Sequence, residues 1–287
     1  MSTASPRVNE PIRVTRQDGI AWVTIDAPPM NLLGGELMGG LMGLVDTLER
    51  DTTTRVAVLR SADPDFWIAH GDVVSITSVP VAPPSEARPE ATELNFVHQI
   101  FERLRKLPQV TIAQIEGYVR GGGSELALAC DMRFAARGKA VFGQPEIALG
   151  ILPGAGGTAR LARLVGRARA SEIIFGGGDF SADEAERYGW INRALPPAEL
   201  PEFVAKLARR IASFPALALQ EAKRAIQSVS DATTDADLLV EQRAFDRLMN
   251  DPRSERKPRM DRFLARGVQT RDGERGLAAA CESLGSD

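Results

Sequence analysis

Cysteine, histidine and lysine are all scarce in this chain of 287 residues, which holds two Cys, two His and five Lys. The two cysteines, Cys130 and Cys281, lie far apart and have no neighbouring Cys or His at a spacing that binds zinc or forms a redox pair. Two separate thiols are typical of a reducing compartment. We therefore expect a cytoplasmic protein with plain thiols and no metal site.

Long apolar runs are also missing. No stretch approaches the roughly 20 apolar residues of a membrane helix, and residues 1–11 hold no apolar segment of signal-peptide length. The net charge is only −3, and no basic stretch is interleaved with aromatic residues as in RNA-binding proteins. These absences predict a protein that binds neither membranes nor nucleic acid.

What is present is enough apolar material for a large core, at 44% of the residues. Alternating apolar residues predict a β-hairpin over 12–26 that turns at Asp18-Gly19. Apolar residues at helical spacing predict a helix over Gly35–Arg50. Two short apolar runs, Val56–Arg60 and Val110–Ile115, predict buried strands. Strands therefore alternate with helices, as in an α/β protein.

Two later regions differ in composition from this pattern. Residues 73–89 contain four prolines among Ser and Ala, which predicts a mobile surface loop of the kind that covers a site. From Leu200 onward helical patterns dominate, over Phe203–Ile211, Ala216–Val229 and Asp237–Met249. We therefore expect a core at 1–199 and a C-terminal helical region at 200–287.

The most informative stretch follows the strand predicted at Val110–Ile115. It runs through Gly121-Gly122-Gly123 into a helix that carries Glu125. Consecutive glycines at a helix start leave amide N–H groups approachable, and the helix dipole adds partial positive charge there. An oxyanion would be stabilised at such a point. Taken alone, however, close packing and an ordinary first-turn acid explain the pattern better.

A second block, FGQPEIALGILPGAGGT at residues 142–158, places another acid, Glu146, in a loop framed by Gly and Pro. Together with GGGSELALACD at 121–131, it resembles the crotonase (enoyl-CoA hydratase/isomerase) superfamily. Residues 185–196 and 215–226 resemble two further segments of that family. The resemblance runs from about residue 12 to 229 and weakens in the C-terminal portion.

The resemblance implies an α/β fold: a crotonase-type spiral of repeated ββα units, closed by a C-terminal helical region. Family members usually form trimers that pair as hexamers, and their last helices contribute to subunit contacts and to the CoA site. The implied partners are therefore an acyl-CoA thioester substrate and further copies of the chain, as a homotrimer or homohexamer. No separate cofactor is expected, because coenzyme A is part of the substrate.

Carried over residue by residue, the family pattern makes Glu125 and Glu146 the catalytic acids, and the amides of Gly71 and Gly122 the oxyanion hole. Residues expected to contact substrate or CoA are Ala69, His70, Asp72, Gly121, Pro145, Gly154, Phe263 and Arg266. The chain departs from the family at His70, where Gly is typical. Histidine tolerates a positive φ, so we expect the loop to keep its shape and His70 to be a surface or ligand-rim residue.

The chemistry of hydration accounts for this set of groups. Adding water to a 2-enoyl-CoA requires a base for the water at Cβ, a proton donor at Cα and stabilisation of the thioester enolate. Two close carboxyls titrate as a coupled pair, so one can hold a proton while the other is ionised. We assign the water to Glu125 and the Cα proton to Glu146, which predicts formation of 3-hydroxyacyl-CoA.

Several alternatives stay open. An enoyl-CoA isomerase could use the same acids, and a homologue could bind acyl-CoA without turnover. Residues 154–159 also fit a dinucleotide fingerprint with Glu172 downstream, although Pro153 precedes the first glycine and no predicted strand ends there. Ser124 has part of a nucleophile elbow, but the final Gly is missing and only His70 and His98 could serve it.

Overall fold

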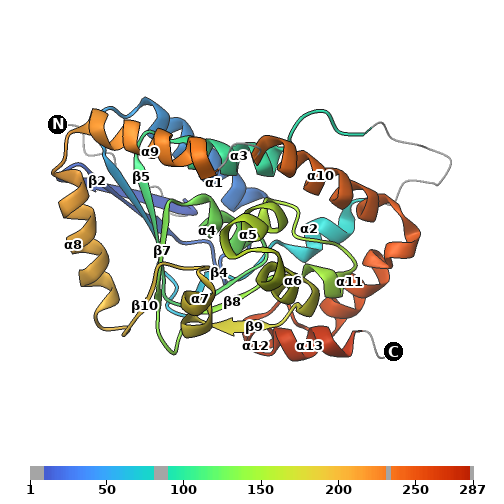
Figure 1. Cartoon of the computed structure of the whole chain (residues 1–287). Coiled ribbons are helices and arrows are strands. Elements are labelled where there is room, and N and C mark those ends of the chain that lie inside the picture. The colour runs from blue at the N-terminus through green and yellow to red at the C-terminus, as the bar shows by residue number, and fades with distance from the viewer. Residues whose placement is uncertain (1–9, 81–89, 231–233, 285–287) are drawn as a thin grey trace.

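The computed structural model describes residues 10–80, 90–230 and 234–284. Most of the proline-rich part of the loop predicted at 73–89 falls at 81–89, outside the described residues. The chain forms two β-sheets that are surrounded by helices (Figure 1).

The larger sheet has six strands in the order β1-β2-β3-β5-β7-β10. Neighbouring strands are parallel except for the β1-β2 hairpin. The strands of this sheet are β1 (Ile12–Gln17), β2 (Ile20–Ile25), β3 (Val56–Ser61), β5 (Val110–Ile115), β7 (Met132–Ala136) and β10 (Arg193–Leu195).

The smaller sheet has the order β4-β6-β8-β9, in which only the β8-β9 pair is antiparallel. Its strands are β4 (Phe66–Ile68), β6 (Tyr118–Arg120), β8 (Val141–Gly143) and β9 (Asp179–Ser181). Consecutive strands go to different sheets: β3, β5 and β7 join the larger one, and β4, β6 and β8 join the smaller one. Because helical segments follow each such pair, the predicted α/β architecture of repeated ββα units is confirmed.

Helices cover both sheets and close the C-terminal side. In the N-terminal two thirds they are α1 (Gly35–Arg50), α2 (Val73–Ser78), α3 (Phe96–Lys106), α4 (Gly122–Ala129), the 3-10 helix η1 (Glu146–Leu149), α5 (Gly157–Val165), α6 (Arg167–Gly176) and α7 (Ala182–Tyr188). After residue 199 they are α8 (Leu200–Ala212), α9 (Ala216–Ser230), α10 (Thr234–Asn250), the 3-10 helix η2 (Pro252–Ser254), α11 (Arg256–Ala265), α12 (Arg271–Arg275) and α13 (Leu277–Ser283).

The elements predicted from periodicity are confirmed. The hairpin turns at Asp18 and Gly19, whose φ values of 52° and 75° are those that a tight two-residue hairpin turn requires. The helix over Gly35–Arg50 and the strand over Val110–Ile115 have the predicted bounds. The helix buries one apolar face, whereas the strand is buried on both faces, as expected for a short apolar run in the middle of a sheet.

The prediction of a loop from Val73 is wrong at its start, because Val73–Ser78 forms the helix α2. Asp72 caps this helix by accepting a hydrogen bond from the Val74 amide. The helix is also held by tertiary contacts, since Val73 and Ile76 join a cluster of apolar side chains from α10, α11 and α13. Those partners lie about 170 residues or more further along the chain, so local composition could not reveal them.

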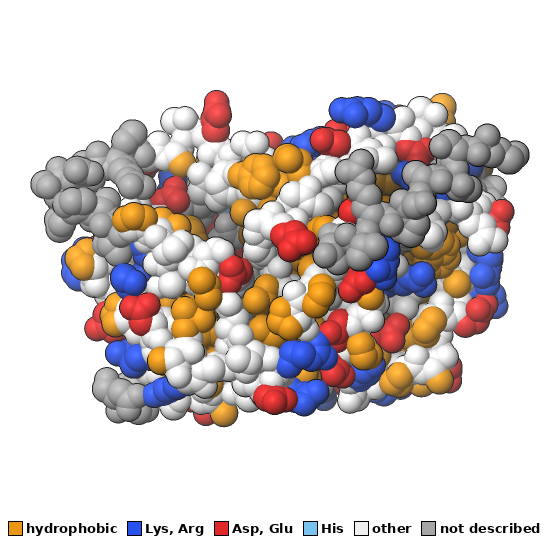
Figure 2. All heavy atoms as spheres, turned by 180° about the vertical axis from the view of Figure 1, so that it is seen from behind, with side chains coloured by type: hydrophobic (Ala, Val, Ile, Leu, Met, Phe, Trp, Pro, Cys, Tyr) orange, Lys and Arg blue, Asp and Glu red, His pale blue; other side chains and the backbone are white. Residues whose placement is uncertain are grey.

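The C-terminal helices pack at two places. Helix α8 lies against the larger sheet, where Leu200, Val204 and Ala208 meet Val58 and Ile112. Helices α10 to α13 lie at the opposite end of the molecule (Figure 1). Within the described parts of the chain, no helix is both long and apolar enough to cross a bilayer. On the face seen in Figure 2, basic and acidic side chains are interspersed with apolar ones.

Candidate active site

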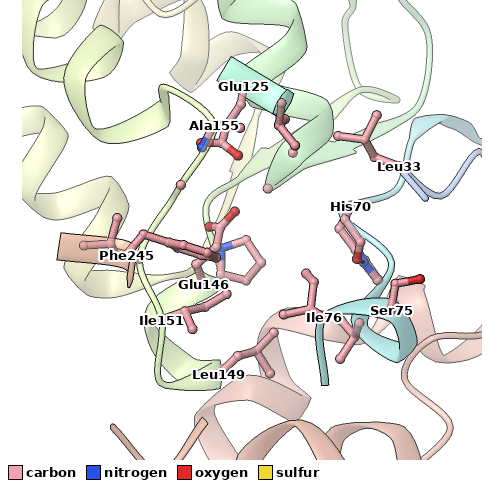
Figure 3. A pocket seen from close by; sticks show the side chains of 18 of the residues that line it. Leu33, His70, Ser75, Ile76, Glu125, Glu146, Leu149, Ile151, Ala155 and Phe245 are labelled. Carbon is pink, nitrogen blue, oxygen red and sulfur yellow. Dashed lines mark hydrogen bonds between the residues drawn. The ribbon is translucent and has the colours of Figure 1, made fainter. Parts of the chain in front are cut away.

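A cavity of about 340 Å³ lies where α2, α4, η1 and the loop before α5 meet α10 and α11. Its walls are mostly apolar and include Val73, Ile76, Leu149, Ile151 and Met249. Figure 3 shows Glu125 and Glu146 facing Leu33 and His70 across this space. Two carboxyl groups in an apolar cavity are costly to ionise, and such a combination is typical of a functional site.

Glu125 reaches the cavity from the first turn of α4 and is only 3% exposed. Its Oε1 accepts hydrogen bonds from the amides of Ala155 and Gly157, at 2.7 and 2.8 Å. These amides belong to the loop before α5 and to its first residue, so the carboxyl group is anchored to a helix N-terminus. Its position is therefore fixed by main-chain atoms.

Glu146 is the first residue of η1 and is 8% exposed. The amide group of Gln144, turned so that its nitrogen faces the acid, donates to both carboxyl oxygens of Glu146 at 3.1 Å. The same amide group borders Glu125, since a Cβ on Gly157 would lie 2.8 Å from Glu125 Oε1 and 2.9 Å from the Gln144 side chain. Gln144 therefore binds Glu146 and lies near Glu125.

The two acids hold protons more tightly than ordinary glutamates. Burial raises the pKa of Glu125 to about 8, the charge of Glu241 adds to the effect, and the amides of Ala155 and Gly157 oppose it. Burial and the charge of Glu125 raise the pKa of Glu146 well above its usual range. Because each charge disfavours the other, the pair can retain a proton near neutral pH.

The glycine triplet makes room for this arrangement. Gly121 has φ of +47°, and a Cβ there would lie 2.7 Å from Glu146 Oε1. At Gly122 a Cβ would lie 2.8 Å from Leu33 Cδ2 and 3.6 Å from the amide nitrogen of Gly71. At Gly123 it would meet the carbonyl oxygen of Ile68 at 2.4 Å. Gly123 therefore excludes a side chain because backbone is in the way, Gly121 disfavours one through its positive φ, and a side chain at Gly122 would have to displace Leu33.

Gly71 and Gly122 both line the cavity, one on either side of the same space. Gly71 pairs with Leu33 in an isolated parallel bridge, in which the Leu33 amide donates to the His70 carbonyl at 2.9 Å and the Asp72 amide donates to the Leu33 carbonyl at 3.2 Å. Among the described residues, neither the Gly71 nor the Gly122 amide has a hydrogen-bond acceptor. Two N–H groups in this position can receive a developing oxyanion.

The predicted contact residues divide into two groups. His70, Gly121, Pro145, Gly154 and Phe263 line the cavity together with the two acids and the two oxyanion-hole glycines. The remaining three residues do not line it and are Ala69, Asp72 and Arg266.

Each of the three has another place in the fold. Ala69 is buried beside Met30 and Phe66, behind the cavity wall. Asp72 caps α2, as described above. The Arg266 guanidinium donates to Ser283 Oγ at 2.6 Å, at the C-terminal end of the chain.

His70 is not a surface residue, which corrects half of its prediction. Its side chain is buried and forms part of the cavity wall, with its ring edge against Phe263. Its Nε2 lies 3.0 Å from Glu274 Oε2. The loop nonetheless brings Gly71 beside Gly122, as expected if the loop keeps its shape. Glu274 had no signal in the sequence, because its partner is about 200 residues away.

The two competing motifs are explained by structure. Residues 154–159 follow η1 and a loop instead of a strand, and Glu172 lies within α6, where it accepts a hydrogen bond from the Tyr188 hydroxyl at 2.8 Å. Ser124 is fully buried, and its hydroxyl has no hydrogen-bond partner among the described residues. Within the described residues, therefore, no strand leads into 154–159 as in a dinucleotide site, and Ser124 makes no hydrogen bond to a histidine as in a hydrolase.

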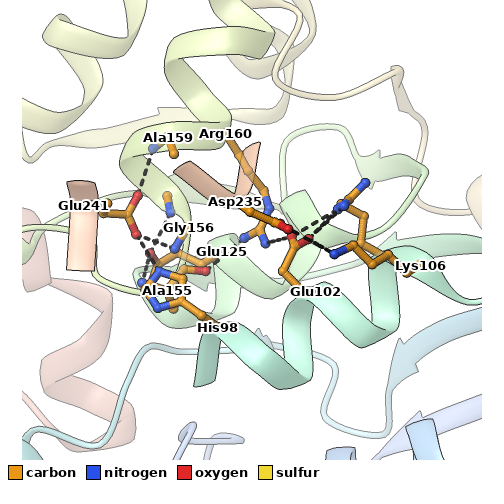
Figure 4. A network of polar contacts seen from close by, with 12 residues as sticks. His98, Glu102, Lys106, Glu125, Ala155, Gly156, Ala159, Arg160, Asp235 and Glu241 are labelled. Atoms are coloured by element: carbon orange, nitrogen blue, oxygen red, sulfur yellow. Dashed lines mark hydrogen bonds and ion pairs between the residues drawn. The ribbon is translucent and has the colours of Figure 1, made fainter. Parts of the chain in front are cut away.

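Sequence reasoning missed Glu241, a buried acid behind Glu125. Glu241 comes from α10 and accepts hydrogen bonds from the amides of Gly156 and Ala159, at 2.5 and 2.8 Å. Its Oε1 also lies 3.2 Å from His98 Nε2 (Figure 4). Glu125 and Glu241 therefore share one turn of chain, each bound to a different pair of its amides. The apolar pattern of α10 gave no reason to single out this acid.

Arg160 stabilises the other side of this turn, which comprises residues 155–159. The guanidinium donates to the carbonyl of Ala155 at 2.9 Å and to Glu102 Oε1 at 2.8 Å (Figure 4). Glu102 is also bound by Arg105. Gly156 must be glycine here, because its φ is +102° and a Cβ would fall 1.8 Å from Arg160 Nη1. The backbone around the Glu125 carboxyl is thus held from three helices.

A metal-based site has no support in the part of the chain that the structure covers. Within residues 10–80, 90–230 and 234–284, no group of three or more His, Cys, Asp or Glu side chains is arranged to hold an ion. Both cysteines are buried and unpaired.

Comparison with known proteins gives a consistent result. Residues 15–269 match the family model described as enoyl-CoA hydratase/isomerase. The short-chain-enoyl-CoA hydratase of Clostridium acetobutylicum is 32% identical over 80% of this chain and 86% of its own length. The 2,3-dehydroadipyl-CoA hydratase of Escherichia coli is 33% identical over 81% and 88%.

Solved structures agree with the sequence relatives. The crystal structure of a candidate enoyl-CoA hydratase from Streptomyces avermitilis superposes with a TM-score of 0.85 at 36% identity, covering 98% of this chain and all of that one. The enoyl-CoA hydratase from Bacillus anthracis gives a TM-score of 0.69 at 31% identity, covering 82% of this chain and 90% of that one. This chain therefore belongs to the enoyl-CoA hydratase/isomerase family.

Proposed function

We propose that the chain adds water to 2-enoyl-CoA thioesters to give 3-hydroxyacyl-CoA. The observation that supports this reaction best is the meeting of two buried carboxyls and two unbonded amides around one apolar cavity. Several relatives that cover most of the chain carry the names of enoyl-CoA hydratases, which favours the same reaction.

In the proposed reaction the thioester oxygen accepts hydrogen bonds from the Gly71 and Gly122 amides. Ionised Glu125 takes a proton from water as the water oxygen bonds to Cβ. The electron pair of the double bond moves to form the enolate, and protonated Glu146 gives its proton to Cα. The raised pKa values of both acids keep a proton available at neutral pH, and the reaction uses the form of the pair in which Glu125 is ionised and Glu146 is protonated.

The apolar walls of the cavity fit an acyl chain, and Gly154 and Phe245 bound the space beside Glu125 and Glu146. A Cβ on Gly154 would lie 2.4 Å from the Phe245 ring, so this glycine lets α10 approach the acids. We infer that Phe263, which lies in the opposite wall, contacts the substrate. The acyl-chain length is left to experiment.

The test is an assay of purified protein with panels of 2-enoyl- and 3-enoyl-CoA thioesters of increasing length. We expect the conjugated thioester absorbance of the 2-enoyl substrates to disappear and 3-hydroxyacyl-CoA to form. Reaction of the 3-enoyl substrates alone would establish an isomerase and contradict the proposal. Binding of acyl-CoA without turnover of either panel would establish the non-catalytic alternative.

We also propose that the chain assembles as a homotrimer or a pair of trimers. Helix α9 supports self-association because it exposes Leu217, Ile226 and Val229, by 67%, 68% and 85%. Light scattering after size-exclusion chromatography should give three or six times the chain mass, and a monomer at all concentrations would contradict the assignment. A cytoplasmic location stays a prediction.

A further inference from the structure

His70 immediately precedes Gly71 and is the residue at which the chain departs from the family pattern. The ring is 4% exposed and belongs to the cavity wall. Both of its nitrogens face oxygen atoms: Nδ1 lies 2.6 Å from the carbonyl oxygen of Gly71, and Nε2 lies 3.0 Å from Glu274 Oε2. Figure 3 places this ring across the cavity from the two acids.

These contacts constrain the protons on the ring. A carbonyl oxygen only accepts, so the Nδ1 that contacts Gly71 carries a hydrogen. An ionised carboxylate also only accepts, and a neutral imidazole has just one N–H to offer. The Nε2 contact is an ion pair without the alignment of a hydrogen bond, because neither Nε2 nor Glu274 Oε2 satisfies hydrogen-bond geometry. An imidazolium supplies both the hydrogen that the Nδ1 contact needs and the positive charge that the ion pair at Nε2 needs.

The charges around the ring balance only if His70 is cationic. Arg120 is fully buried and donates to Glu274 Oε1 at 2.7 Å, and its other nitrogens bind Asp179 at 2.7 Å. Arg120 and a protonated His70 then match the two carboxylates of Glu274 and Asp179. A neutral ring would leave these two carboxylates with a single cation, although Glu274 is fully buried and only Asp179 is partly exposed to solvent, and an unmatched charge at a buried site is costly.

All neighbouring charged groups can be placed. Burial and Arg120 disfavour the imidazolium, but the charge and contact of Glu274, with the Gly71 carbonyl, outweigh them and raise the pKa of His70. Glu146 lies beyond Gly121, whose absent Cβ would be 2.7 Å from Glu146 Oε1 and 3.6 Å from His70 Cβ. His70 therefore stands between Glu274 of α12 and the acid of η1.

The other side of Gly71 is held by the same C-terminal segment. Gln269 donates through Nε2 to Asp72 Oδ1 at 2.9 Å and accepts from the Val73 amide at 2.7 Å. Residues before and after Gly71 are thus both tied to residues 269–274. The peptide units on both sides of Gly71 are held in place.

We propose that His70, held as an imidazolium between the Gly71 carbonyl and Glu274, is a positioning residue that orients the Gly71 amide and keeps positive charge beside the developing enolate. The role of His70 in catalysis rests on the proposed hydration reaction. The protonation of the His70 ring does not depend on any reaction.

The first experiment measures that protonation directly. The chain has only two histidines, so histidine labelled with 15N and 13C in the rings gives two sets of NMR signals, which the His98→Gln variant assigns. A free imidazole with a pKa of about 6.5 would be almost entirely neutral at pH 8. We expect both ring nitrogens of His70 to stay protonated at pH 8 in the wild type. A ring that is neutral at pH 7 would overturn the proposal.

The second experiment tests the link to catalysis. Glu274→Gln keeps the side-chain size but removes the charge that holds the proton on His70. Relative to wild type at each pH, we expect its kcat to be close to normal at pH 6 and roughly tenfold lower at pH 8.5, with KM little changed. A ratio of variant to wild type that does not vary with pH would overturn the positioning role.

His70→Gln provides a second variant that cannot carry a positive charge. We expect kcat to fall roughly tenfold or more at every pH, with KM within about twofold of wild type. An unchanged kcat would overturn the proposal. If the protein hydrates no enoyl-CoA, the proposed function fails, whereas a neutral His70 in an active hydratase defeats this inference alone.

Discussion

The two sides of the cavity are built alike but differ in charge. On the acid side, Glu125 accepts hydrogen bonds from the turn before α5. Glu241 of α10 binds the same turn from behind and contacts His98. On the amide side, Gly71 lies in the loop before α2, and behind that loop Glu274 of α12 meets His70. Each of the two histidines thus pairs with one buried glutamate from the C-terminal helices.

The difference lies in what else surrounds each pair. On the acid side three carboxyls converge, and the nearby guanidinium of Arg160 bonds to Glu102. Burial first, and then the excess of negative charge, raise the pKa values of Glu125 and Glu146 and favour bound protons on both acids. On the amide side Arg120 completes a balanced cluster. One region is therefore suited to proton transfer, and the other to receiving negative charge.

The largest expected effect comes from removing an acid. Glu146→Gln should lower kcat for 2-enoyl-CoA hydration by about 100 to 10,000-fold, because the proton for Cα is lost. Glu125→Gln should act similarly through loss of the base. Steady-state kinetics measures both changes. Glu202→Gln, an exposed acid of α8 on the far side of the larger sheet, is the control and should be unaffected. Activity in Glu146→Gln above a tenth of wild type would remove this acid from the mechanism.

A change on the amide side should be nearly as large. In Gly122→Ala the added Cβ enters the space between the two amides, near Leu33 Cδ2 and the Gly71 nitrogen. We expect kcat to fall by about 100 to 1,000-fold, as for loss of one oxyanion donor. Gly39→Ala is the control, because nothing lies within 4 Å of the new methyl on exposed α1. If both alanine variants keep full activity, this pair of amides does not form an oxyanion hole.

The burial of Glu125 beside other acids should also appear as pH-dependent stability. Burial, with the charge of Glu241, raises the pKa of Glu125 in the folded protein to about 8 from its ordinary value of 4.5. Its stabilising contribution is thus complete below the unfolded pKa and is lost as pH rises through the folded one. We expect wild type to lose roughly 3 to 4 kcal/mol of unfolding free energy between pH 5 and pH 8.5. Urea unfolding should show a smaller loss for Glu125→Gln; an equal loss would mean that other groups cause it.

The smallest expected effect separates the two supporting glutamates. Glu241→Gln removes a charge that raises the pKa of Glu125. We expect the acidic limb of the kcat/KM profile to move to lower pH by about half a unit to one unit. Glu274→Gln should leave that limb in place and act on the alkaline side. Identical shifts in the two variants would show that the two sides of the cavity are not electrostatically distinct.

Much of the fold, and the groups that face the cavity, could be predicted from the sequence. The hairpin and the helix over Gly35–Arg50 follow from apolar periodicity, and the strand over Val110–Ile115 follows from a short apolar run; each segment carries its signal within itself. The residues Glu125, Glu146, Gly71 and Gly122 were named from motif resemblance, and the fold brings them to one cavity. Such groups lie in short continuous motifs, so the motif records their relative placement.

Only the tertiary structure revealed the buried side chains that support those groups. Glu241 and Glu274 lie on C-terminal helices whose local sequence is ordinary, and their importance comes from Gly156, His98 and His70, which are more than 80 residues distant. Helix α2 likewise forms where composition predicted a loop, because Val73 and Ile76 find apolar partners on later helices. Burial and charge pairing depend on distance in space, and a linear pattern does not contain that distance.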